Sequence, residues 1–163
     1  MKIFMPFLLV FAFFATSVAQ TTNTNYVCKK ETKEVWRELA DSGRYHEAIN
    51  ILLDSIQKNK VKNKKSTYWH IGQLYACNNE YELAINYLKK STGFIDKIFD
   101  REWRLYYKGT IAFLQRDKKK LKAYHERLWN QHSEYYYCNA FKLKAFYENF
   151  EKPYRWVYDM PCE

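Results

Sequence analysis

The stretch from Tyr68 to Ser91 constrains the fold of this chain more than any other part of the sequence. Large and small side chains alternate along it at helical spacing, and a tight polar turn divides it into two halves. The large residues are Tyr68, Ile71, Tyr75, Tyr81 and Leu88, and the small ones are Gly72, Ala76, Ala84 and Ser91. Because small residues let two backbones approach closely, this arrangement predicts two short antiparallel amphipathic helices.

The second half of this pattern also occurs earlier in the chain. The segment GRYHEAINILLDS aligns with NEYELAINYLKKS and pairs Tyr45 with Tyr81, Ala48 with Ala84, Leu52 with Leu88 and Ser55 with Ser91. We therefore expect a helix from Tyr45 to about Gln57. A helical pattern also starts at Thr32 and stops at a turn over residues 41–43, so this region is expected to form a helix pair of its own.

A weaker copy follows the central stretch. Asp117 is expected to be the N-cap of a helix that runs from Lys118 to Leu128. Three residues of the preceding helix correspond to the central copy: Leu105 to Tyr68, Gly109 to Gly72 and Ala112 to Tyr75. The chain thus contains about three related helix pairs, of which the third is degenerate.

The C-terminal part is expected to cover the open end of this stack. Residues 134–150 predict one more helix, with Tyr137, Phe141 and Ala145 on one face. The tail after it contains Pro153 and Pro161 and is not expected to be helical throughout. Glycine and proline are scarce in the whole chain (4 and 3 residues) and aromatic residues make up 19%, which favours an all-helical protein with a substantial core.

The central stretch closely matches a known helix-pair consensus, W-x2-L-G-x2-Y followed by A-x3-F, in a repeat of about 34 residues. Tyr68, Ile71, Gly72 and Tyr75 occupy the first half, with tyrosine in place of tryptophan, and Ala84 and Leu88 occupy the second half. The chain therefore resembles the tetratricopeptide repeat family from Thr32 to Leu128. The resemblance implies an all-α helix-turn-helix repeat array, an α-solenoid, over residues 32–133, with a capping helix and tail over 134–163.

Proteins of this family stack helix pairs into a right-handed superhelix, and the first helix of each pair lines a concave groove that binds peptides or extended segments. Carried over position by position, the resemblance assigns seven residues to this groove: Lys33, Arg37, Trp69, Gln73, Trp103, Tyr106 and Thr110. For Trp69 and Trp103, packing between repeats is the alternative, because aromatic stripes at helical spacing are usually core. The family's clamp for a C-terminal carboxylate is not expected, because only Lys33 fits its pattern.

The N-terminus has the pattern of a secretory signal peptide over residues 1–19. It contains the basic Lys2, an apolar run from Ile3 to Ala15, and small residues at 17–19. An uncleaved anchor is the alternative, but the run is shorter than the roughly 18–20 residues that span a bilayer. We expect export to the periplasm or the exterior, no membrane span after cleavage, and a leader over residues 20–31.

The formal net charge of the whole chain is +9. Two runs, Lys58–Lys65 and Lys118–Lys122, concentrate this charge. Solvated loops or helix faces are the simpler interpretation of such runs, and weak attraction to anionic polymers or surfaces is the functional one. We expect an exported scaffold that binds a protein or peptide in its groove, with a basic module for anionic polymers or surfaces as the alternative.

Several common catalytic motifs are missing from the sequence. His46-Glu47 and His125-Glu126 each lack the second histidine of a zinc-protease motif, and there is no Cys-x-x-Cys or Gly-x-Ser-x-Gly. His125 and His132 are two helical turns apart, which fits ordinary surface histidines better than a metal site. We therefore expect no enzyme activity, cofactor or small-molecule substrate.

Four cysteines, Cys28, Cys77, Cys138 and Cys162, would enter an oxidising compartment and allow three complete pairings. The prolines of the tail can bend it back along the last helix, so we expect a disulfide between Cys138 and Cys162. Cys28 and Cys77 would pair only if the leader loops back. A free, buried Cys77 is therefore an equal alternative.

Overall fold

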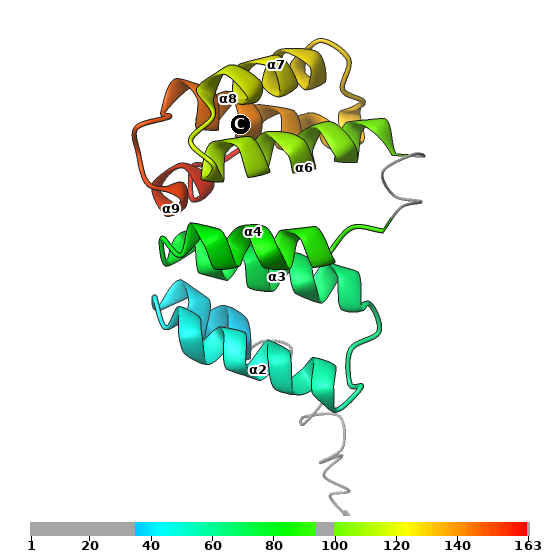
Figure 1. Cartoon of the computed structure of the whole chain (residues 1–163), viewed down its shortest axis with the longest axis vertical. Helices are drawn as coiled ribbons and strands as arrows, with labels where there is room; N and C mark the ends of the chain where they lie inside the picture. Colours follow the sequence, from blue (N-terminus) through cyan, green and yellow to red (C-terminus); the bar gives the residue numbers. More distant parts are fainter. Residues whose placement is uncertain (1–34, 94–99, 163) are drawn as a thin grey trace, which may run out of the picture.

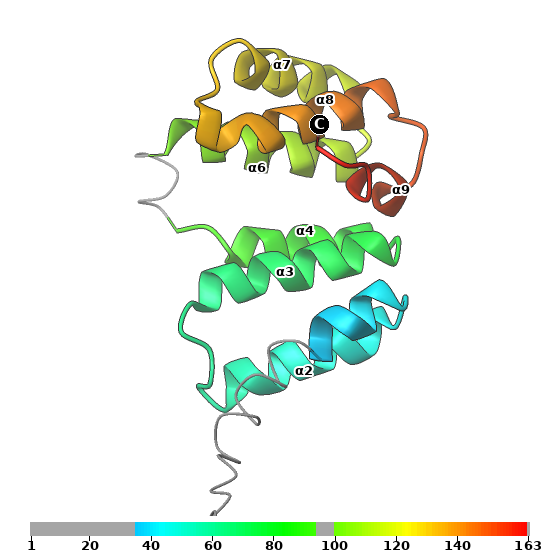
Figure 2. The same ribbon diagram turned by 180° about the vertical axis from the view of Figure 1, so that it is seen from behind.

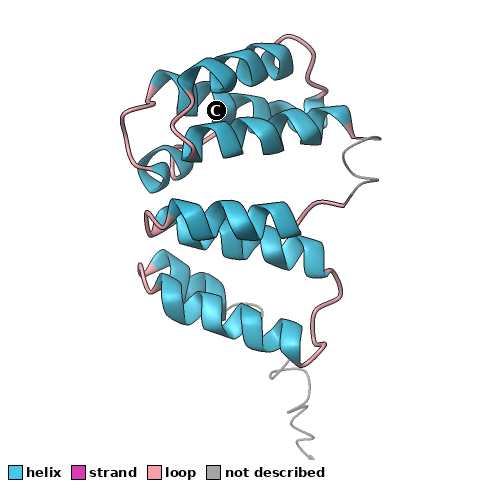
Figure 3. Ribbon diagram, viewed as in Figure 1, coloured by secondary structure: helices cyan, strands magenta, loops and turns pink. Residues whose placement is uncertain are grey.

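The computed structural model describes residues 35–93 and 100–162, and all regular structure in these two ranges is helical (Figure 3). Residues 35–41 are helical. The elements that follow are α2 (Tyr45–Gln57), α3 (Lys64–Cys77), α4 (Tyr81–Lys90), α6 (Arg101–Leu114), α7 (Lys118–Trp129), the 3-10 turn η1 (Glu134–Tyr136), α8 (Tyr137–Glu148) and α9 (Tyr154–Tyr158). The expected signal peptide and leader, with Cys28 and Lys33, lie outside the described residues.

Consecutive helices form antiparallel pairs that stack on one another (Figures 1 and 2). Residues 35–41 pair with α2, α3 pairs with α4, and α6 pairs with α7, while α8 packs on α6 and α7. The chain is thus an all-α helical repeat array with a C-terminal capping helix, as expected. Helix α3 begins at Lys64, earlier than the sequence pattern indicates, because the Asn63 side chain accepts a hydrogen bond from the backbone of Ser66.

The turn inside each pair has the same backbone geometry in all three copies. Its central residue is left-handed, with φ of 79° at Gly43, 62° at Asn79 and 57° at Arg116. In each turn the next backbone N–H reaches back to a carbonyl five residues earlier: Arg44 to Leu39 (2.8 Å), Glu80 to Tyr75 (2.9 Å) and Asp117 to Ala112 (2.9 Å). This is the Schellman ending of a helix. The third pair therefore repeats the turn of the other two even where its sequence is degenerate, and Asp117 caps α7 as expected.

Two glycines mark the closest approaches between helices. A Cβ atom at Gly72 would lie 2.7 Å from the Leu88 side chain of α4 and 3.1 Å from the Ala84 carbonyl oxygen. A Cβ atom at Gly109 would lie 2.5 Å from Leu143. Gly72 thus brings its own pair together, whereas Gly109 admits the capping helix α8, a role that the alignment of the two glycines does not predict.

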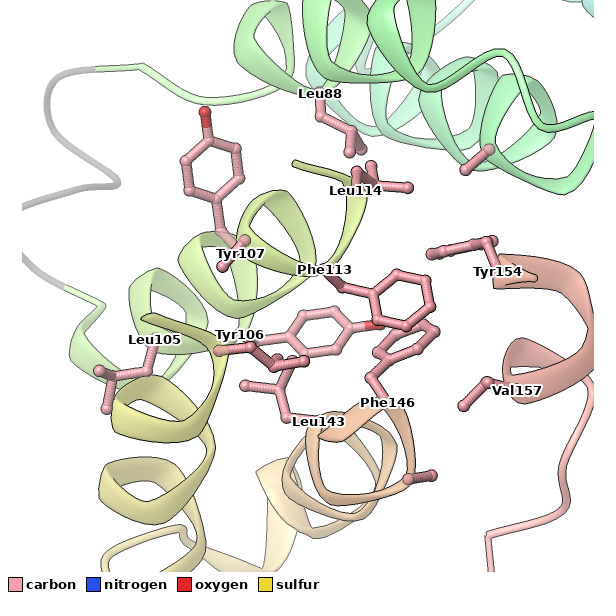
Figure 4. Packing of buried hydrophobic residues seen from close by; sticks show 14 of the residues in the cluster. Leu88, Leu105, Tyr106, Tyr107, Phe113, Leu114, Leu143, Phe146, Tyr154 and Val157 are labelled. Atoms are coloured by element: carbon pink, nitrogen blue, oxygen red, sulfur yellow. The ribbon is translucent and has the colours of Figure 1, made fainter. Parts of the chain in front are cut away.

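The largest core cluster joins α3, α4, α6, α7, α8 and α9 (Figure 4). From α8 it receives Leu143 and Phe146, which are fully buried, and Phe146 packs on Phe113 of α6 with ring centroids 4.5 Å apart. Tyr137, at the start of this helix, is 37% exposed, whereas Ala145 on the same face is buried. The docking of α8 on α6 at Gly109 turns the Leu143–Phe146 side inward.

Candidate functional site

The C-terminal tail folds back against α3 and is held there by side-chain packing and hydrogen bonds. Its short helix α9 packs on α8 and α3, with Val157 fully buried. The Tyr158 hydroxyl accepts a hydrogen bond from Gln73 Nε2 at 3.1 Å. Lys142 Nζ donates to the carbonyl oxygens of Tyr158 (2.7 Å) and Met160 (2.6 Å). The tail is therefore an integral part of the array.

The expected disulfide is present and holds the end of this tail. Cys138, in the first turn of α8, is bonded to Cys162, and their Cα atoms are 5.6 Å apart. Cys77 forms no disulfide with another cysteine of the described residues. Its thiol is largely buried, and burial raises its pKa to about 12, so that it stays protonated near neutral pH.

Several of the residues assigned to the groove lie under this tail or in the core. Thr110 is fully buried and its Oγ1 donates to the Tyr106 carbonyl at 3.0 Å, while the Tyr106 ring points into the aromatic core beside α9 (Figure 4). Burial raises the pKa of the Tyr106 hydroxyl well above its ordinary value. Trp69 is 8% exposed and its ring lies 4.7 Å from that of Trp103. These two tryptophans thus pack between repeats, the alternative role that the sequence leaves open.

A half-open cleft of about 260 Å³ remains between residues 36–45, α3 and α9. It contains Arg37 and Gln73, so the structure brings two of the seven assigned residues together. Trp36, Tyr45 and Tyr158 supply aromatic walls, and Ala40, Leu74 and Cys77 add apolar surface. The Tyr45 hydroxyl is buried and has no hydrogen-bond partner among the described residues.

A chain of hydrogen bonds crosses one wall of this cleft. His70 Nδ1 is 3.2 Å from Gln73 Oε1, and Gln73 Nε2 donates to Tyr158. The Gln73 side chain thus links the His70 ring to the Tyr158 hydroxyl. Burial lowers the pKa of His70, and the nearby Arg37 charge lowers it further despite the Gln73 bond, so the imidazole is neutral near pH 7. The ring also lies 5.2 Å from Trp36.

The charges that line the cleft are balanced. Arg37 lies over the Trp36 ring at 4.5 Å, and Arg155 lies over the Tyr45 ring at 5.3 Å. Arg155 Nε is 2.9 Å from Asp159 Oδ2, and Asp41 adds a second carboxylate. Two cations beside two carboxylates on aromatic walls favour a ligand of mixed polarity over a strongly charged one.

The wall of the cleft that the C-terminal tail provides was not predicted from the sequence. Arg155, Tyr158 and Asp159 all lie in the tail, which was not expected to be helical throughout. One signal was available, because Tyr154, Val157 and Tyr158 follow an i, i+3, i+4 helical pattern directly after a proline.

The described residues contain no group of three or more histidine, cysteine, aspartate or glutamate side chains that could hold a metal ion. No helix among them is long and apolar enough to cross a bilayer. Comparisons with protein-family models, curated proteins and solved structures find no match for this chain.

Proposed function

We propose that this protein is an exported scaffold of tetratricopeptide-like repeats that binds another protein by accepting one of its side chains into the cleft between residues 36–45, α3 and α9. The observation that carries this proposal is the lining of the cleft, where aromatic walls, two arginines and two aspartates surround a half-open cavity. Aromatic and arginine side chains of this kind are enriched where protein interfaces gain most of their affinity.

The size of the cleft supports a single side chain as its occupant. Pockets for drug-sized ligands or cofactors occupy about 300–1,000 Å³. The cavity of about 260 Å³ is smaller, so it suits one aromatic or long apolar side chain. The imidazole of His70 and the charged side chains provide partners for the polar atoms next to that side chain.

The rigidity of the tail supports binding as well. Because Cys138–Cys162 and Lys142 fix the tail, Tyr158 and Arg155 keep their places before any partner arrives. A wall that is already ordered loses little conformational entropy on binding. The disulfide, together with the apolar N-terminal segment, also fits an exported protein.

Site-specific photo-crosslinking tests this proposal. A photoreactive amino acid replaces Asp41 at the rim of the cleft, and in a matched control it replaces Leu83, an exposed residue of α4 that is 42% accessible. In extracts of the producer's cell envelope we expect one protein to be crosslinked from position 41 and not from position 83. Adding Arg37→Glu should abolish that adduct in a protein with an unchanged circular dichroism spectrum. Equal adducts from both positions, or an adduct that survives Arg37→Glu, would refute the proposal.

A further inference from the structure

The two lysine runs of the sequence have different surroundings in the structure. In α7, Lys120 Nζ is 2.8 Å from Asp117, Lys122 Nζ is 3.7 Å from Glu126, and Lys118 lies over the Tyr147 ring at 5.8 Å. These lysines neutralise neighbouring carboxylates or cover aromatic rings. The α7 run is therefore partly neutralised by carboxylates of its own helix, which pair with Lys120 and Lys122.

The run between α2 and α3 is largely unneutralised. Lys58 is 2.8 Å from Asp54. Lys60, Lys62 and Lys64 are exposed, and none of them has an ion-pair partner within residues 35–93 and 100–162. Residues 55–79 contain no aspartate or glutamate at all. Within the described residues, the charges of Lys60, Lys62 and Lys64 are thus not neutralised by an ion pair.

Helix stability does not explain these lysines either. Lys64 and Lys65 occupy the first turn of α3, and this turn contains no acidic residue. The N-terminal end of a helix carries a partial positive charge, so basic residues there are unfavourable. Lys64 thus stands where a basic residue weakens the helix, which points to a use outside the fold.

The end of α4 adds to the same side of the molecule. Because α3 and α4 are antiparallel, the loop that precedes α3 and the C-terminal end of α4 lie on one side in both views (Figures 1 and 2). Lys89 is exposed and unpaired among the described residues, and Lys90 lies over the Tyr87 ring at 4.5 Å, where it keeps its charge. We call Lys60, Lys62, Lys64, Lys89 and Lys90 the basic edge.

The surroundings of the basic edge discriminate among anionic partners. Nucleic acids and sugars stack on open aromatic faces, but here Tyr87 packs on Tyr68 and Tyr75, with centroids 6.1 and 5.3 Å away. A protein partner would find no large exposed apolar anchor, since the exposed large hydrophobic side chains of the described chain lie elsewhere. The edge contains only lysine, a point charge on a flexible stem, and none of the arginine forks that suit paired phosphate contacts.

We propose that the basic edge binds the anionic phospholipid headgroups of a membrane surface, without inserting into the bilayer. Such a surface needs only several positive charges within reach of one plane. Each lysine near an anionic leaflet raises membrane affinity by about fivefold. This inference does not depend on the cleft, which is lined by residues 36–45, α3 and α9.

Vesicle co-sedimentation tests it, using the chain that begins at Gln20 and keeps every described residue. The probes are vesicles with 30% phosphatidylglycerol in phosphatidylcholine, and vesicles of pure phosphatidylcholine. The test variant is Lys60→Gln/Lys62→Gln/Lys64→Gln. The matched control, Lys119→Gln/Lys122→Gln/Lys152→Gln, removes the same net charge from exposed lysines of the α7–α9 region.

We expect binding to the anionic vesicles only, steep weakening between 50 and about 300 mM salt, and an affinity loss on the order of 100-fold in the test variant. The control variant should bind almost as well as the unmodified chain. Equal losses in both variants would assign binding to overall charge and overturn the inference. An absence of vesicle binding would also overturn the inference, whether or not the protein binds a soluble polyphosphate tightly. Arg37→Glu, which addresses the cleft, should leave vesicle binding within about threefold of the unmodified value.

Discussion

Replacement of Gly72 by alanine should destabilise this protein, although alanine is the better helix former. In an unconstrained helix the change would stabilise by about 0.5–1 kcal/mol. Here the new Cβ atom would lie 2.7 Å from Leu88 Cγ and Cδ2, and 3.1 Å from the Ala84 carbonyl oxygen. Leu88 is fully buried and cannot swing into solvent, and a backbone carbonyl cannot move without its helix.

The size of the effect follows from these two opposing contributions. Overpacking of a well-packed core costs about 1–3 kcal/mol. After the gain in helix propensity, Gly72→Ala should lower the free energy of unfolding by about 1–2 kcal/mol. Leu88→Ala alone should cost about 2–5 kcal/mol. In the double variant the contacts with Leu88 are gone and only the 3.1 Å contact with the Ala84 carbonyl oxygen remains, so its loss should be smaller than the sum of the two single losses by about 1 kcal/mol.

Urea unfolding followed by circular dichroism measures all three variants. Leu128→Ala serves as the matched control, since Leu128 is equally buried but lies in α7, which packs mainly on α6 and α8. Gly72→Ala should combine additively with Leu128→Ala. If Gly72→Ala stabilised the protein, or were additive with Leu88→Ala, the close approach of α3 and α4 would not be what requires glycine here.

Three further predictions concern the tail and the cleft. Cys138→Ser/Cys162→Ser should lower the free energy of unfolding by about 3 kcal/mol, measured by urea unfolding, and adding a reductant to the double variant should have no further effect. Tyr45→Phe should raise the free energy of unfolding slightly, by up to about 1 kcal/mol, because it removes a buried hydroxyl without a partner. A marked loss of stability in thermal unfolding would reveal a hydrogen bond to that hydroxyl. Because burial lowers the pKa of His70 below its ordinary value of 6.5, the unfolded chain binds the proton more readily, and stability should fall as pH drops below about 6.5. His70→Gln should flatten that fall in a pH series of thermal midpoints, and an unchanged slope would show that His70 does not cause it.

Much of the fold could be predicted because its signals are local. The spacing of Tyr45, Ala48 and Leu52 fixes the buried face of α2, and this helix has the predicted bounds. Asp117 caps α7 through its own side chain, a contact three residues long in sequence. The disulfide between Cys138 and Cys162 was also predicted, since the chain between them is long enough for the tail to return along α8.

The candidate site was harder to predict, because it depends on contacts between distant parts of the chain. A five-residue helix such as α9 has too few internal hydrogen bonds to be stable alone. Its position is set by partners like Gln73, which is 85 residues away from Tyr158 in sequence. Without that contact, nothing near residue 158 indicates that it lines a cleft with Arg37.

The sequence by itself determined that this chain forms stacked helix pairs. From Tyr68 to Ser91, large and small residues alternate at helical spacing. Two closely packed helices bury the large residues of such a pattern. Only the tertiary structure decided which aromatic residues are core and which line a site. Trp69 and Gln73 are four residues apart on one face of α3, yet the stacking of the helix pairs buries the Trp69 ring against Trp103 of α6 while Gln73 lies in the cleft wall beside the returning tail. Periodicity specifies the face of a helix, but what covers that face depends on the packing of the rest of the chain.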